Sequence, residues 1–258
     1  MLRPRPLITA VVFDLDDTLY DCYRQRVLAA HRYACEKMLR AGLERRPRRR
    51  VSFQRLFRLR LQLFREEHNL ETLDPRLLAR LGLRGREAAR LARAGCRAYF
   101  SYPVRNLRLF PDARPTLRRL HRCGVRIFVL TAGIRTIQRA KVRLLGLDRL
   151  PYIQEIFYTG RRRGHGKSGY LRRVLRVEPD PRRVLVVGDR ADSEIRAARQ
   201  LGMWTVRRRG GEFAAYEARE RLEHPHFTIR RLSQIFRLRF TFGRCPGRAS
   251  GVPKRKKS

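Results

Sequence analysis

Short runs of apolar residues alternate with amphipathic segments along most of the chain. The runs are typical of strands buried on both faces of a parallel sheet, and the segments between them have apolar residues at helical spacing. Gly146 and Gly202 follow two of these segments, where a glycine favours a left-handed helix end. The alternation predicts an α/β fold with a doubly wound, Rossmann-like parallel sheet. The predicted strands are 7–13, 125–130, 152–158, 184–187, 203–206 and 227–229, and the predicted helices are 113–122, 134–145, 168–175 and 193–201.

Residues 21–105 interrupt this alternation. They contain no strand-like run, their apolar residues recur at helical spacing, and Ser52 suits the N-cap of one helix. We expect an all-helical insertion, residues 21–105, in a Rossmann-like core formed by residues 1–20 and 106–236. Within the insertion, the run RRPRRR at 45–50 favours a loop, because proline and crowded like charge both disfavour a helix. The tail, 237–258, has eight basic residues and no acid and is predicted to be disordered.

The chain is strongly basic. It has 62 lysines and arginines against 23 acids in 258 residues, a net charge of +39, which is typical of proteins that bind polyanions. Only six of the basic residues are lysines, and three of these lie among the last five residues. Because arginine and lysine carry the same charge at neutral pH, the lopsided choice favours a background arginine bias over dedicated nucleic-acid binding. A nucleic-acid partner, with the basic tail as its candidate contact, stays an alternative.

Cysteine usage and the N-terminal residues bear on the cellular compartment. The five cysteines are scattered and form no C-x-x-C pair, so we expect free thiols in a reducing compartment. The first apolar run reaches Asp14 too soon for a signal peptide, and no window approaches 18 apolar residues. These features predict a cytoplasmic protein with no membrane span. The sequence leaves the oligomeric state open.

Polar residues that follow the apolar runs are the first candidates for chemistry. In an open α/β sheet, ligands bind outside the carboxyl ends of the strands. Asp14, Thr131 and Asp189 each follow a predicted strand, and Lys167 opens a predicted helix. Asp14 also begins a D-x-D-x-T sequence, in which one carboxylate can attack while the next transfers protons. Taken alone, such a sequence fits an ordinary aspartate-rich turn equally well.

Four segments occur in an order that adds weight to these candidates. They are VVFDLDDTLYD, LTAGIRTIQRAKVRLLGL, GKSGYLRRVL and VLVVGDRADSEIRAARQLGMWTV, and HFTIRRLSQI follows them. In this order and spacing the chain resembles the haloacid dehalogenase-like superfamily of hydrolases, in the subfamily with a helical C1-type cap. The resemblance covers most of residues 7–20 and 107–236.

The resemblance implies an aspartyl-phosphate mechanism. Asp14 is expected to attack phosphorus. Asp16 is expected to protonate the leaving oxygen and then to deprotonate a water, a role that favours a raised pKa beside a second carboxylate. Mg²⁺ is the expected cofactor, held by Asp14, by the backbone carbonyl of Asp16 and by Asp189.

The resemblance also implies a phosphate-binding pair, Thr131 and Lys167. Lys167 stands out because arginine replaces lysine almost everywhere else, whereas a threonine after a strand is more often a helix N-cap. Glu194 occupies the place of a second acid in the last motif and is expected either to bind Mg²⁺ through water or to orient Lys167. Asp192 is the alternative for that place, or a helix-start carboxylate that interacts with the helix dipole.

An acid at position 16 favours an oxygen leaving group, which needs a proton, over a halide, which does not. We therefore expect a phosphatase acting on a small phosphorylated metabolite rather than a dehalogenase. A phosphomutase, and a nucleic-acid-binding protein on a catalytically decayed hydrolase scaffold, stay open as alternatives. Four residues soon after the first motif could contact an anionic leaving group, or simply lie on the surface: Tyr23, Arg24, Arg26 and Arg32.

Overall fold

The computed structural model describes residues 4–43, 51–160 and 166–243. The chain divides into a core unit, Met1–Tyr20 with Leu109–Ser258, and a cap unit, Asp21–Arg108. The sequence predicted the insertion at 21–105. The predicted loop at 45–50 lies outside the described residues.

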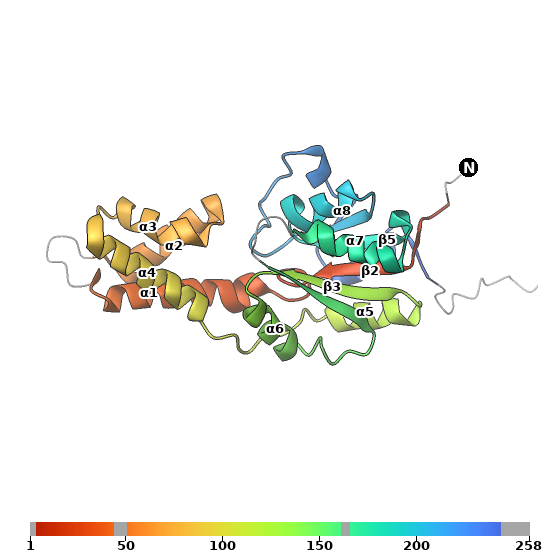
Figure 1. The fold of residues 1–258 in the computed structure, drawn as a ribbon, viewed down its shortest axis with the longest axis horizontal. Coiled ribbons are helices and arrows are strands. Elements are labelled where there is room, and N and C mark those ends of the chain that lie inside the picture. Colours follow the sequence, from red (N-terminus) through yellow and green to blue (C-terminus); the bar gives the residue numbers. More distant parts are fainter. Residues whose placement is uncertain (1–3, 44–50, 161–165, 244–258) are drawn as a thin grey trace, which may run out of the picture. The chain divides into compact units, whose positions relative to one another are not determined.

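The core unit is built on a six-stranded sheet in which every pairing is parallel, so the predicted fold class is confirmed (Figure 1). The strand that carries Asp14 lies at its centre, with Val12 opposite Phe128 on one side and Val186 on the other. In spatial order the strands are β4 (Ile153–Thr159), β3 (Arg126–Ala132), β2 (Ala10–Asp14), β5 (Val184–Gly188), β6 (Trp204–Arg208) and β7 (Phe227–Ile229).

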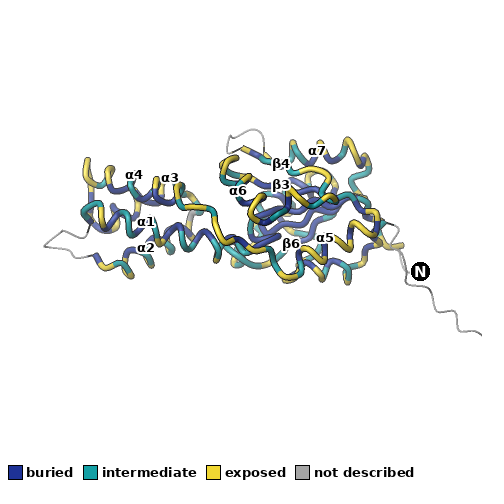
Figure 2. The backbone as a smooth tube through the Cα atoms, turned by 90° about the horizontal axis from the view of Figure 1, so that it is seen from below, coloured by how far each residue is buried: buried dark blue, intermediate teal, exposed yellow. Residues whose placement is uncertain are grey.

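Helices cover both faces of this sheet. Figure 1 shows α7 (Lys167–Val177) and α8 (Arg196–Gln200) on one face and α5 (Ala113–Arg122) and α6 (Arg135–Leu144) on the other. Strand residues such as Val12 and Phe128 pack with Leu171 of α7 in one buried cluster. The central strands β2, β3 and β5 are mostly dark blue in Figure 2 because they are buried on both faces. Short 3₁₀ turns complete the core unit: η3 (Pro181–Arg183), η5 (Arg221–Glu223) and η6 (Leu232–Arg237).

The first predicted strand is interrupted at Thr9. The N–H of Thr9 donates to Arg183 O at 3.0 Å, its carbonyl accepts the N–H of Arg126 at 2.9 Å, and its hydroxyl donates to Glu178 at 2.5 Å. The two residues before it form β1 (Leu7–Ile8), which pairs with β8 (Thr241–Phe242) in a separate parallel sheet. The prediction of disorder throughout 237–258 is therefore wrong for β8. Residues 244–258 lie outside the described residues.

The helix predicted at 193–201 is two elements. A π-helical turn, η4 (Ala191–Ile195), precedes α8 (Arg196–Gln200). Arg190 is the N-cap residue of η4. Its backbone N–H donates a hydrogen bond to the side chain of Glu194 at 2.7 Å. Single π turns are frequent at functional sites.

In its described residues, 21–43 and 51–108, the cap unit has a π-helical turn and four α-helices. Ser52 is an N-cap as predicted: its side chain accepts a hydrogen bond from the N–H of Arg55 at 3.3 Å. Ala30, Ala34, Ala98 and Tyr99 form a buried cluster that joins the first and last α-helices of the cap. The elements are η1 (Tyr23–Val27), α1 (Leu28–Arg40), α2 (Phe53–Glu67), α3 (Leu70–Arg80) and α4 (Gly85–Ser101).

Three charged or polar side chains of the cap meet in its interior. Arg60, Asp74 and His31 are each fully buried. The guanidinium of Arg60 donates to both carboxylate oxygens of Asp74, at 2.8 and 3.0 Å, and to Nδ1 of His31. Because an arginine only donates, His31 is a neutral ring whose Nδ1 accepts. Gly95 gives this cluster room, since a Cβ there would lie 2.8 Å from the carboxylate of Asp74.

The cysteines depart from expectation at one position. Cys22, Cys35 and Cys96 are thiols, but Cys123 is disulfide-bonded, so the prediction that all five are free is wrong. The absence of a C-x-x-C pair misled the prediction, because a disulfide depends on the distance between two residues in the fold and not on their spacing in the sequence. Among the described helices, none is long and apolar enough to cross a membrane.

Candidate active site

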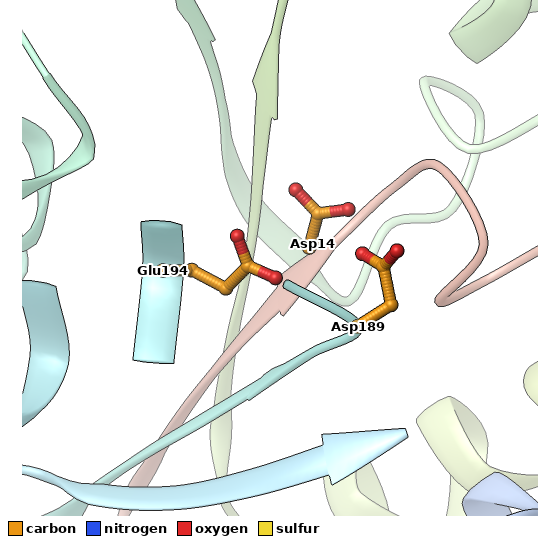
Figure 3. A group of neighbouring side chains, drawn as sticks. All are labelled: Asp14, Asp189 and Glu194. Carbon is orange, nitrogen blue, oxygen red and sulfur yellow. The ribbon is translucent and has the colours of Figure 1, made fainter. Parts of the chain in front are cut away.

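The carboxyl ends of β2 and β5 bring the predicted acids together. Asp14 is the last residue of β2, and Asp189 follows β5 directly. Glu194 reaches the same point from η4, and a ligand oxygen from each of the three lies within 4.8 Å of the others. Figure 3 shows the three carboxyl groups converging from separate elements.

Lys167, the first residue of α7, contacts this group of acids. Its ammonium donates to Asp14 and, at 2.6 Å, to Glu194. Both contacts are buried. Burial alone would lower the pKa of Lys167, but the two carboxylates raise it above its ordinary value. The ammonium therefore stays charged.

Three acids face one ammonium in this buried cluster. Burial, and then the neighbouring carboxylates Glu194 and Asp16, raise the pKa of Asp14 to about 7, against the attraction of Lys167. Burial, and then Glu194 and Asp14, raise the pKa of Asp189 well above its usual range. Together the three acids form a hard, oxygen-rich donor set whose ionised forms a bound cation would favour. The residues fit a divalent cation such as Mg²⁺.

Gly188, between β5 and Asp189, makes the position of Glu194 possible. A Cβ at residue 188 would lie 2.3 Å from the Glu194 side chain, so only glycine leaves space for that carboxylate. Asp192, the alternative acid, instead forms an ion pair with Arg190 at 2.8 Å. Of the two sequence candidates, Glu194 is the one that lies in the acid cluster and also binds Lys167.

Asp16 lies beside this cluster and is held by a different lysine. Lys141 Nζ lies 2.9 and 2.7 Å from its two oxygens, and Tyr20 Oη donates to it at 2.8 Å. Burial raises the pKa of Asp16, but Lys141 and the hydrogen bonds outweigh that effect and bring its pKa below the usual value. The prediction of a raised pKa at Asp16 is therefore wrong, because the neighbour that dominates is a cation and not a second carboxylate.

Thr131 contacts the same group of residues as Asp16. Its hydroxyl accepts a hydrogen bond from Gln138 Nε2, which also donates to Asp16 at 3.1 Å and to Ala132 O at 3.0 Å. Thr131 does not cap α6, because the N-cap position of that helix belongs to Ile134. Thr131 and Asp16 therefore both contact the side-chain amide of Gln138.

Gln138 and Lys141 are the residues of this site that sequence reasoning missed. They are three apart on α6 and so lie on one face of that helix. A signal was present for Lys141. It is one of only three lysines that precede the basic tail. Like Lys167, it stands out because arginine replaces lysine almost everywhere else in the chain.

Asp17 has a structural place in the same loop. It adopts a left-handed backbone conformation with φ of 54°, which aspartate tolerates better than most residues. Its carboxylate accepts the N–H of Glu212 at 3.1 Å, and its carbonyl accepts Arg208 Nη1 at 2.8 Å. These bonds fix the turn that carries Asp16 away from β2.

The family model of haloacid dehalogenase-like hydrolases matches residues 8–202, which include every candidate residue named above. The chain belongs to this family. A glyceraldehyde 3-phosphate phosphatase of Methanopyrus kandleri is 31% identical over 89% of this chain and 96% of its own. A ribulose-1,5-bisphosphate 5-phosphatase of Halopiger xanaduensis is 29% identical over 78% of this chain and 84% of its own.

Solved structures of the family share the fold. A predicted phosphoglycolate phosphatase from Haemophilus somnus superposes with a TM-score of 0.63 at 17% identity, over 89% of this chain and 97% of that one. The hydrolase YfnB from Bacillus subtilis, solved with magnesium, gives a TM-score of 0.58 at 18% identity over the same shares. At these identities the similarity shows the fold.

Proposed function

We propose that this hydrolase is a Mg²⁺-dependent phosphatase that cleaves a small phosphorylated metabolite. The observation that carries the proposal is the pairing of two differently held aspartates at one strand end. Asp14 lies in the acid cluster with Lys167. Asp16, two residues on, is held outside that cluster by Lys141. This arrangement supports Asp14 as the attacking group, beside the residues that suit a cation and a phosphoryl group, and Asp16 as the neighbouring group that exchanges protons.

In the proposed first step, an oxygen of Asp14 attacks phosphorus while the bond from phosphorus to the ester oxygen breaks. Lys167 and Thr131 are proposed to hold phosphoryl oxygens, one by charge and one by its hydroxyl. In the second step a water attacks the phosphorus of the aspartyl-phosphate, and phosphate leaves as the carboxylate of Asp14 re-forms. Splitting the displacement in this way replaces one difficult step by two easier ones.

Asp14, Asp189 and the backbone carbonyl of Asp16 are proposed to hold Mg²⁺, with Glu194 beside them. When bound, the ion neutralises the charge that opposes the approach of a phosphate to these carboxylates.

The lowered pKa of Asp16 suits the second step, because an ionised carboxylate can accept a proton from water. For the first step Asp16 must take up a proton, which Lys141 opposes. Esters with acidic leaving groups need that proton least. We therefore choose p-nitrophenyl phosphate as the first substrate, and we extend the panel to glyceraldehyde 3-phosphate and ribulose 1,5-bisphosphate because of the relatives' names.

The decisive variant is Asp14→Asn. We expect it to lower Mg²⁺-dependent hydrolysis by at least about 10³-fold, because an amide is a poor nucleophile, while circular dichroism and the melting temperature show an intact fold. Asp148→Asn is the matched control, since it makes the same change at an exposed position. A wild-type protein inactive on the whole panel, or an Asp14→Asn variant as active as Asp148→Asn, contradicts the proposal.

A further inference from the structure

The cap unit contains a groove with an unusual lining. Its volume is about 670 Å³, and it is bordered by η1, α1, α2 and the segment after α4. Four arginines face one acid, Glu36, in this lining, and three tyrosines lie among them. A second hollow of about 470 Å³ shares Arg32, Phe57, Leu61 and Arg65 with the first, so the two adjoin. The arginines are Arg24, Arg32, Arg65 and Arg105, and the tyrosines are Tyr23, Tyr33 and Tyr102.

Arg32 is held in this groove by aromatic rings and not by an acid. Its guanidinium lies 5.6 Å from the ring centroid of Phe53 and 5.4 Å from that of Phe57. Those two rings stack at 5.8 Å. Glu36 is four residues away on α1, yet among the described residues Arg32 forms no ion pair with it or with any other acid. Ring contacts fix the guanidinium without using its N–H donors.

Arg65 is also held by an aromatic side chain and not by an acid. Its Nη2 donates to the hydroxyl of Tyr23 at 3.1 Å, which orients the guanidinium and leaves its other donors for a ligand. Arg60, on the same helix, is the contrasting case, since its Nε and Nη2 donate to Asp74 and its Nη1 donates to His31. A background arginine bias explains the number of arginines. It does not explain why these two are held by aromatic side chains in a groove.

From this arrangement we propose that the cap groove binds a small organic phosphate. Arg32 and Arg65 take the phosphoryl group, because guanidinium donors match phosphate oxygens in pairs. Phe57 and Leu61 contact the apolar or aromatic body of the ligand. The volume lies within the usual range for small-molecule sites. Three of the four residues singled out after the first motif line this groove, whereas Arg26 is buried and lies over the ring of Tyr99.

This site differs from the core site in its need for a cation. The groove has a positive lining and binds an anion directly. In the core, Asp14, Asp189 and Glu194 repel an anion unless a cation is present. Binding in EDTA that is lost when the groove arginines are replaced therefore reports the groove and not the catalytic site. Because hydrolysis is not needed for this measurement, its failure and the failure of the proposed phosphatase activity are distinguishable.

The test is calorimetric titration of the full chain with phenyl phosphate and with inorganic phosphate, in EDTA at physiological ionic strength. We expect saturable binding of both ligands, weakened about 10- to 100-fold by the double variant Arg32→Ala, Arg65→Ala. The matched control is Arg118→Ala, Arg122→Ala, which removes the same charge from an exposed face of α5 and should change affinity less than about twofold. Phe57→Leu should weaken phenyl phosphate more than inorganic phosphate, because it removes a ring contact to the ligand body as well as one of the two rings that contact Arg32.

Three outcomes overturn the proposal. One is the absence of saturable binding in EDTA. Another is an equal loss in the two double variants, which would mean that affinity follows net charge. The third is displacement of phenyl phosphate by single-stranded oligonucleotides with a strength that grows with their length, which would assign the groove to nucleic acid.

Discussion

Two buried ionic clusters, one in each unit, differ in how their charges balance. In the cap, Arg60 faces Asp74 in a two-point contact and His31 is neutral. In the core, Asp14, Asp189 and Glu194 gather around one lysine. The cap cluster pairs one positive with one negative charge. The core cluster holds an excess of negative charge at the carboxyl edge of the sheet.

The pKa shifts separate the two clusters in the same way. Burial, and then the charge of Arg60, lower the pKa of His31 to about 2, so the ring stays neutral. In the core, the pKa values of Asp14 and Asp189 are raised, which means that their ionised forms are destabilised by their surroundings. Like charges held close together repel one another and add no stability to the fold. The comparison teaches that a balanced buried cluster supports the fold, whereas an unbalanced one indicates a site for a ligand.

The largest expected effect tests the core side of this comparison. Asp189→Asn should lower the proposed Mg²⁺-dependent hydrolysis by about 10³-fold, or about 4 kcal/mol of barrier, because an oxygen ligand of the proposed cation site is lost. The same variant should raise the melting temperature in EDTA. A carboxyl with a raised pKa opposes folding at neutral pH, and the amide removes that repulsion.

Activity against p-nitrophenyl phosphate and the melting temperature in EDTA are measured for Asp189→Asn and for the exposed control Asp148→Asn. If Asp189→Asn melts lower than wild type in EDTA, the acids do not repel one another as described, and the contrast with the cap fails.

The next effect tests the cap side. Asp74→Ala leaves the fully buried Arg60 without its carboxylate, which should cost about 3 kcal/mol of unfolding free energy. Urea denaturation measures this cost. Glu71→Ala, an exposed acid on the same helix, is the control and should cost less than about 1 kcal/mol.

Replacing both partners, with Arg60→Met and Asp74→Leu together, should recover most of the loss, because no unpaired charge is then buried. A double variant as unstable as Asp74→Ala shows that the pair itself, and not the stranded arginine, sets the stability of the cap.

The sequence predicted the core of this molecule well because apolar runs report burial directly. The predicted strand 227–229 coincides with β7, and 184–187 differs from β5 by one residue. The break at Thr9 was missed because the residues before it pair with β8, which is distant in sequence. Local apolar pattern carries no information on such contacts.

The acids of the site were predictable for the same reason, since Asp14 and Asp189 follow buried strands. What could not be predicted is which cation each acid contacts. Asp14 and Asp16 do lie close together, as their spacing in the sequence predicted. Lys141, 125 residues away, nevertheless lowers the pKa of Asp16 below its usual value. Side-chain contacts between two elements depend on how each helix is rotated about its axis and on the side-chain rotamers. The apolar pattern of a single sequence does not specify either of these.

The smallest expected effect is a pH dependence that belongs to the cap alone. In the unfolded chain His31 takes up a proton below pH 6.5, but in the folded chain it does not until about pH 2. Protons therefore favour the unfolded state as the pH falls below 6.5, and this histidine should cost about 1.4 kcal/mol of stability per pH unit in that range.

Urea denaturation between pH 7 and pH 4.5 measures the slope. His31→Phe should make the slope shallower by that amount, whatever its effect on stability at pH 7. His121→Gln, at an exposed position, should leave the slope as in wild type. If the His31 and His121 variants lose stability with equal slopes, His31 is protonated in the folded cap, and the cap cluster carries excess charge just as the core cluster does.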